Sequence, residues 1–98
     1  MKTREEVLEI LNASLPKLRE CGVREIGVFG SVARREQREK SDVDIVVDLK
    51  HHTFDSYMDL LFFLEERLEC RIDLVMKDTL KPAIRNEVIS ETVYVETI

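Results

Sequence analysis

Helical and strand-like hydrophobic patterns alternate along the whole chain. A capping-box pattern at Thr3, followed by apolar residues at helical spacing, predicts a helix over 3–20 that is bent or restarted near Pro16. A short apolar run then predicts a strand over 26–29 that stops at Gly30. The chain therefore begins as a helix followed by a strand.

The rest of the chain continues this alternation, with turn residues and helix caps between the periodic segments. The predicted elements are one or two helical turns over 31–35, a polar loop over 36–41, a buried strand over 43–49, a helix capped by Thr53 that runs to Leu68, a strand over 71–76, a helix from Asp78 or Thr79 to Ser90, and a short strand over 93–95. This order predicts one α/β (α+β) domain over 1–98, with helices packed against a small sheet.

Size limits what such a domain can enclose. A chain of 98 residues with 44% apolar residues can bury one core, but it has no room for a second domain around a large substrate. Any large acceptor must therefore bring its own binding surface.

The charge distribution argues against a long polyanionic partner. The net charge is −5, whereas a protein that binds DNA or RNA usually carries an extended basic face. Basic residues gather only at Arg34, Arg35, Arg38 and Lys40. Such a local cluster suits a few phosphate groups, so we expect no direct binding of nucleic acid.

The chain carries no pattern of a signal peptide and no apolar run of about 20 residues, the length needed to cross a membrane. Its two cysteines, Cys21 and Cys70, lack metal-ligand spacing and are expected to be buried, reduced thiols. We therefore expect a cytoplasmic protein without a membrane partner.

A possible anion site follows the first strand. Gly30 lets the backbone approach a ligand closely, and the next helical turn presents backbone N–H groups together with the Ser31 hydroxyl. Taken alone, a glycine and a serine after a strand more often form a plain turn. The aspartates that follow this turn in the sequence favour the interpretation as a phosphate site.

Three aspartates are candidates for a metal site. Asp42 and Asp44 project from the same side of a strand, where a divalent cation would relieve their repulsion. Asp73 lies in an apolar strand, where a buried, unpaired carboxylate would be costly. A solvated strand start for the first two, and a salt bridge to Arg71 or Lys77 for the third, are the alternatives.

If the strands of these acids are neighbours, the three carboxylates meet beside the glycine-serine turn. Three acids, a phosphate turn and nearby basic residues are typical of two-metal phosphoryl or nucleotidyl transfer. The segments G-S-V-A-R, S-D-V-D-I-V-V-D and R-I-D-L-V together resemble the DNA polymerase beta-type nucleotidyltransferase superfamily. More narrowly, they are similar to the minimal nucleotidyltransferase (MNT) antitoxins that accompany HEPN-domain toxins.

The resemblance implies a role for each matching residue and a nucleotidyltransferase fold with a small mixed sheet. Gly30, Ser31 and Arg34 would bind the triphosphate of ATP. Asp42 and Asp44 would ligate two Mg²⁺ ions, and Asp73 would ligate the catalytic ion and help to deprotonate the attacking hydroxyl. The chain departs from the family at position 35, where arginine replaces the usual glycine.

The resemblance also implies an activity: transfer of AMP from ATP to a hydroxyl, expected to be a tyrosine, of a partner HEPN RNase toxin, which silences it. Two other functions stay open. The chain could neutralise a toxin by binding alone, for which Arg35 is the supporting feature, or it could modify a small molecule.

The remaining polar residues receive ordinary roles. His51 and His52 are assigned to a solvated loop because no third metal ligand has suitable spacing, and Asp48 to a capping or surface role. Tyr57 and Tyr94 are assigned to packing.

Overall fold

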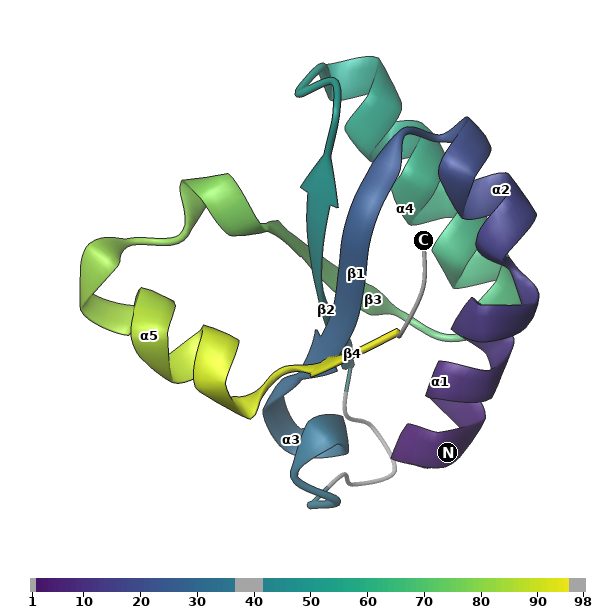
Figure 1. Cartoon of the computed structure of the whole chain (residues 1–98). Helices are drawn as coiled ribbons and strands as arrows, with labels where there is room; N and C mark the ends of the chain where they lie inside the picture. The colour runs from purple at the N-terminus through teal and green to yellow at the C-terminus, as the bar shows by residue number, and fades with distance from the viewer. Residues whose placement is uncertain (1, 37–41, 96–98) are drawn as a thin grey trace.

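Residues 2–36 and 42–95 are described by the computed structural model of the chain (Figure 1). Its elements are α1 (Arg4–Ala13), α2 (Leu15–Glu20), β1 (Val23–Phe29), α3 (Gly30–Ala33), β2 (Val43–Leu49), α4 (Phe54–Leu68), β3 (Ile72–Met76), the 3₁₀ turn η1 (Lys77–Thr79), α5 (Pro82–Glu91) and β4 (Val93–Tyr94). The predicted α/β (α+β) class is confirmed.

The four strands form one mixed sheet in the order β3-β2-β1-β4. β1 runs antiparallel to both β2 and β4, whereas β2 and β3 run parallel and are joined through α4. Because β2 and β3 are parallel neighbours, residues at the beginning of each strand lie at the same edge of the sheet.

Helices α1, α2 and α4 cover one face of the sheet (Figure 1). Side chains alternate between the two faces of a strand, so every second residue of β2, from Val43 to Leu49, points into this helix-covered layer. The core there also contains Val7, Leu11, Leu18, Ile26, Val28, Leu60, Leu64, Leu68, Ile72 and Leu74. The remaining strand residues, which alternate with these, point to the opposite face of the sheet.

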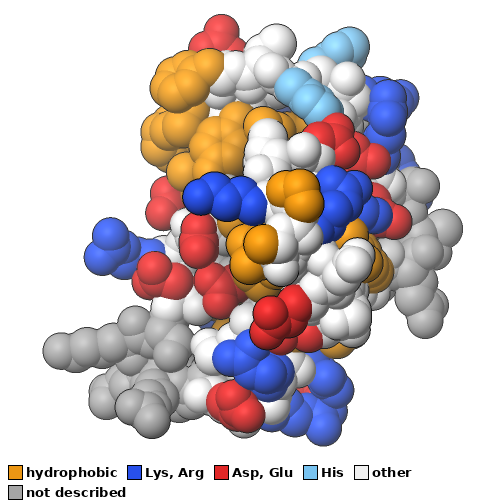
Figure 2. Space-filling model, turned by 90° about the vertical axis from the view of Figure 1, so that its left-hand side faces the viewer, with side chains coloured by type: hydrophobic (Ala, Val, Ile, Leu, Met, Phe, Trp, Pro, Cys, Tyr) orange, Lys and Arg blue, Asp and Glu red, His pale blue; other side chains and the backbone are white. Residues whose placement is uncertain are grey.

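Helix α5 lies on this second face, at a distance from the helix layer (Figure 1). No side chain of α5 is buried. On the same face, the ring of Tyr94 packs over Gly27, and Lys77 Nζ lies 5.6 Å from the centre of that ring. The space-filling view of the side that carries α5 shows acidic and basic side chains interspersed (Figure 2).

Most element boundaries follow local signals. Thr3 caps α1 with a complete capping box, and Thr53 caps α4 through the backbone N–H of Ser56 at 3.0 Å. Ser14 separates α1 from α2, but its hydroxyl donates to the Ile10 carbonyl at 2.7 Å and makes no capping hydrogen bond to α2. Tyr57 packs against the core and donates to the Leu74 carbonyl, as predicted.

Two boundaries differ from prediction. β1 begins at Val23, before the predicted residue 26, because its pairing with β2 reaches Leu49. The last helix does not begin at Asp78 or Thr79: these residues form a short 3₁₀ turn, extended backbone follows at Leu80, and α5 starts at Pro82. Within the described residues, no helix is long and apolar enough to cross a membrane.

Candidate active site

Two of the three predicted acids are direct neighbours in the sheet. Asp44, in β2, is in register with Asp73, in β3. Neighbouring strands lie about 4.8 Å apart, and residues in register point to the same face, so the two carboxylates share one site. Asp42 lies just before β2 and is exposed, and its charge also acts on Asp44. The structure thus places Asp44 and Asp73 side by side, with Asp42 close enough for its charge to act on Asp44.

The pKa of Asp44 reflects the neighbouring acids. Its pKa is raised from the usual 3.8 to about 6, first by burial and then by the charge and hydrogen bonding of Asp73. The charge of Asp42 raises the pKa further, and Arg34 opposes the shift. The raised pKa means that the negative charge at this edge of the sheet is incompletely balanced by the protein itself.

The predicted burial of Asp73 is wrong. Its neighbours Ile72 and Leu74 are buried against the helices, but Asp73 itself is exposed. The strand pattern alternates, and Asp73 belongs to the face that α1, α2 and α4 do not cover. The salt bridge proposed as an alternative is also not seen for Lys77, which instead pairs with Glu25 at 2.6 Å. What singles out Asp73 is its register with Asp44.

Gly30 lies directly against these acids. It has a φ of +72°, and a Cβ atom built there would overlap the carboxylate of Asp44. Phe29, the residue before it, is in register with Asp44 across β1 and β2. The predicted phosphate turn, Gly30 and Ser31 at the start of α3, is therefore adjacent to the predicted metal ligands.

Arg34 follows this turn and contacts two carboxylates. Its Nε donates to Glu36 Oε2 and its Nη1 to Glu91 Oε2, each at 3.0 Å. Both hydrogen bonds raise the pKa of the guanidinium above its usual value. Glu91 also accepts a hydrogen bond from the backbone N–H of Gly30 at 3.0 Å. No sequence motif indicated Glu91, because its partners lie far away along the chain.

Arg35, the departure from the family pattern, is directed away from the turn. Its side chain is ion paired with Glu5 of α1, and Arg4 of the same helix donates to the Ala33 carbonyl at 3.1 Å. Its backbone has a φ of 60°, in the left-handed region that favours glycine. The other predicted basic residues of this cluster, Arg38 and Lys40, lie outside the described residues.

Arg35→Gly is expected to stabilise the chain by about 0.5–1 kcal/mol, because relief of left-handed strain outweighs the added freedom of the unfolded chain and the loss of an exposed ion pair. Urea unfolding would measure this change. Glu5→Gln is the matched control: it removes the ion pair, keeps the backbone, and should change stability by less than about 0.5 kcal/mol. A less stable glycine variant would contradict the strain argument.

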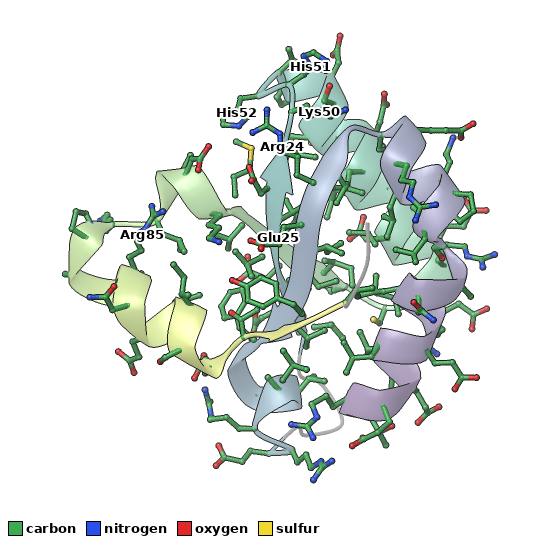
Figure 3. All side chains as sticks on the ribbon, viewed as in Figure 1. Arg24, Glu25, Lys50, His51, His52 and Arg85 are labelled. Carbon is green, nitrogen blue, oxygen red and sulfur yellow. The ribbon has the colours of Figure 1, made fainter. Side chains whose placement is uncertain are left out.

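A second polar cluster lies at the opposite end of β2 and was not predicted. His52 Nε2 is 3.2 Å from Asp78 Oδ2, and one ligand atom from each of Asp48, His52 and Asp78 lies within 4.8 Å of the others. His51 and His52 stand at this end of the sheet, far from α3 (Figure 3). The sequence spacing gave no third metal ligand near the two histidines, but folding brings Asp48 and, from η1, Asp78 next to His52. This second group could hold a metal ion separately from the three predicted aspartates.

An open cleft also lies away from these aspartates. It has a volume of about 690 Å³ and lies between α2, the loop after β2 and α4. Lys17, Lys50 and Phe62 are among its lining residues. None of the predicted site residues lines this cleft; Asp42 and Asp73 are exposed at the surface, and Asp44 is half-buried.

Comparison with known proteins shows the family of the chain. Residues 4–95 match the family model described as nucleotidyltransferase domain. The chain is 50% identical over 97 residues to protein adenylyltransferase MntA of Thermococcus cleftensis, covering 97% of this chain and 98% of that protein.

Solved structures share the fold. A structure described as a minimal nucleotidyltransferase candidate superposes with a TM-score of 0.82 at 33% identity, covering 94% of this chain and 95% of the other. A toxin–antitoxin structure with AMP-PNP gives a TM-score of 0.72 at 22% identity, covering 89% and 73%. A tri-AMPylated Shewanella oneidensis HEPN toxin with its MNT antitoxin gives 0.65 at 19%, covering 93% and 73%. The chain therefore belongs to the nucleotidyltransferase-domain family, in its minimal form.

Proposed function

We propose that this chain is an antitoxin-type protein adenylyltransferase, which transfers AMP from ATP to a tyrosine hydroxyl of a partner HEPN toxin. The observation that carries the proposal is the register of Asp44 with Asp73 beside Gly30. This arrangement joins a carboxylate cluster to a turn that can bind phosphate, the two parts that a nucleotidyl transfer site needs.

The donor set fits magnesium. Three carboxylates at one edge of the sheet supply the hard oxygen ligands that Mg²⁺ prefers, and the raised pKa of Asp44 marks negative charge that a cation would balance. Asp42, Asp44 and Asp73 would hold two Mg²⁺ ions. When bound, magnesium neutralises the triphosphate and lowers the pKa of the attacking hydroxyl.

The protein groups then have distinct tasks. Ser31 and the neighbouring backbone bind the triphosphate, and Arg34 contacts a phosphate oxygen. The acceptor oxygen forms a bond to the α-phosphorus while the bond to pyrophosphate breaks, and Asp73 accepts the hydroxyl proton. Positioning and charge neutralisation supply most of the rate enhancement in such a site.

Two relatives support the choice of acceptor. The protein adenylyltransferase MntA is similar to this chain over nearly its whole length, which favours a protein acceptor over a small molecule. The Shewanella complex pairs an MNT antitoxin with an AMPylated HEPN toxin. An acceptor that brings its own surface also suits a domain of this size, because Asp42 and Asp73 are exposed and can be reached by a partner protein.

Neutralisation by binding alone has less support. The feature in its favour was Arg35, which could have crowded the phosphate turn. Its side chain instead pairs with Glu5 of α1, and Asp44 stays beside Gly30 and in register with Asp73. Nothing in the described residues obstructs the site through position 35.

The test combines the chain with ATP, Mg²⁺ and the HEPN protein encoded next to it, followed by intact mass measurement of that protein. We expect additions of one or more AMP groups, lost in the Asp42→Ala/Asp44→Ala double variant and kept in Asp59→Ala, which alters an exposed acid on α4. Absence of any AMP addition with the unaltered chain would contradict the proposal. Full protection of cells by the double variant would favour neutralisation by binding alone.

A further inference from the structure

We propose that Glu91 is a further residue of the nucleotide site and sets its affinity, because its carboxylate competes with the triphosphate for Gly30 and Arg34. The inference rests on the proposed function to the extent that these two residues bind phosphate. It adds a residue from α5, a helix that sequence reasoning did not connect with the site.

The contacts of Glu91 resemble those of a bound phosphate. Its Oε1 accepts from the Gly30 N–H and its Oε2 from Arg34 Nη1, both at 3.0 Å. One anionic group thus bridges a backbone donor and a guanidinium of the same turn, the combination that also recognises phosphate oxygens. A phosphate that uses the same donors must first displace Glu91.

The charges around Arg34 strengthen this competition. Its guanidinium already contacts Glu36 as well as Glu91, and it lies close enough to Asp44 to lower the pKa of that carboxyl. One positive group therefore faces an excess of carboxylates. Removing the charge of Glu91 would free a donor and lower the repulsion that a triphosphate meets as it approaches.

The attachment of α5 makes displacement of Glu91 possible at low cost. No α5 side chain is buried, and β4, which follows Glu91 closely, fixes this end of the helix by pairing with β1. Glu91 therefore needs only to rotate its own side chain, which exposes little apolar surface. Besides Glu91, Arg85 holds α5 by donating Nη1 to the Lys77 carbonyl at 3.2 Å, near the other end of the helix (Figure 3). Glu91 can thus rotate away from its donors while Arg85 and β4 keep the helix in place.

The experiment measures phosphate binding to the full chain by calorimetry, with inorganic tripolyphosphate and with Mg²⁺-ATP as probes and no acceptor present. Glu91→Gln should lower the Kd for both probes by about three- to tenfold, with a smaller difference at high salt. Glu87→Gln, one helical turn earlier on α5, is the control and should leave the Kd unchanged. Glu36→Gln, which frees Arg34 but not Gly30, should have a smaller effect.

An unchanged or raised Kd in Glu91→Gln would overturn the inference, because Glu91 would then merely position Arg34. Thermal unfolding checks that the variant is folded. If it is not, Glu91→Asp replaces it, since a shorter side chain cannot reach both donors and should also lower the Kd. AMP transfer by the unaltered chain is measured separately, so a failed competition is distinguishable from a failed proposed function.

Discussion

Asp44→Asn is expected to lower the rate of AMP transfer by at least about a hundredfold, because it removes a ligand from a site that stabilises charge in the transition state. The same change should make the chain more stable at pH 7, by an amount on the order of 1 kcal/mol after allowance for solvent screening. Loss of activity with a gain in stability identifies a residue retained for chemistry rather than for folding.

The gain in stability has a defined pH dependence. The pKa of Asp44 is about 6 in the folded chain against 3.8 as its ordinary value. Above pH 6 the folded state carries the full penalty of an ionised carboxylate. As the pH falls from 6 towards 4, the folded state binds the proton more tightly than the unfolded state, and this penalty disappears. The advantage of the asparagine variant should therefore be full at pH 7 and absent near pH 4.

Thermal unfolding of both proteins across this pH range, with AMP transfer measured at pH 7, checks the prediction. Mg²⁺ should raise the melting temperature of the unaltered chain more than that of the variant. Asp59→Asn, on the exposed surface of α4, controls for the loss of one negative charge. Equal melting temperatures of Asp44→Asn and the unaltered chain at pH 7 would mean that the ionised Asp44 carboxylate does not destabilise the folded state.

Gly30→Ala is expected to destabilise the chain by about 2 kcal/mol or more and to abolish AMP transfer. The positive φ of Gly30 costs a residue with a side chain about 1–2 kcal/mol, and the new methyl group would also displace the Asp44 carboxylate. Urea unfolding and the AMP-transfer assay measure the two effects.

Gly22→Ala provides a matched control. Gly22 has a φ of +81°, but the nearest atoms to its added Cβ, from Lys50 and His51, are 3.8 and 3.9 Å away. This variant therefore carries similar backbone strain without an overlap, and it should lose only about 1 kcal/mol and remain active. In an Asp44→Ala background, Gly30→Ala should cost less. An equal loss of stability in Gly30→Ala and Gly22→Ala would argue against the close contact between Gly30 and Asp44.

Local sequence patterns predicted most of the fold because its elements end at strong local signals. The capping box at Thr3, the Thr53 cap and the apolar run of β2 each act over a few residues. The start of β1 was missed since pairing with β2, rather than its own residues, extends it to Val23. The 3₁₀ turn at Lys77–Thr79 was missed for a similar reason, as it depends on the path from β3 to α5.

The residues of the candidate site also fall into those that local sequence predicted and those that depend on the tertiary fold. Asp42, Asp44 and the glycine-serine turn are near one another in sequence, so their grouping could be inferred. The sequence left open whether the strand of Asp73 lies beside that of Asp44, and the parallel pairing of β2 and β3 meets this condition. The exposure of Asp73 could not be read from its apolar neighbours, because it depends on which face the helices cover. Glu91 could not be predicted at all, since only the folded chain brings the end of α5 to Gly30 and Arg34.

The register of Asp44 with Asp73 is set by backbone pairing between two parallel strands and does not depend on the hydrogen bond between the two acids. A deletion of one residue just before β3 would slide that ladder by a single step and turn the aspartate towards α4, with an apolar neighbour taking its place at the sheet edge. This site should therefore tolerate many changes of side chain around it but hardly any change in the length of the segment between α4 and β3.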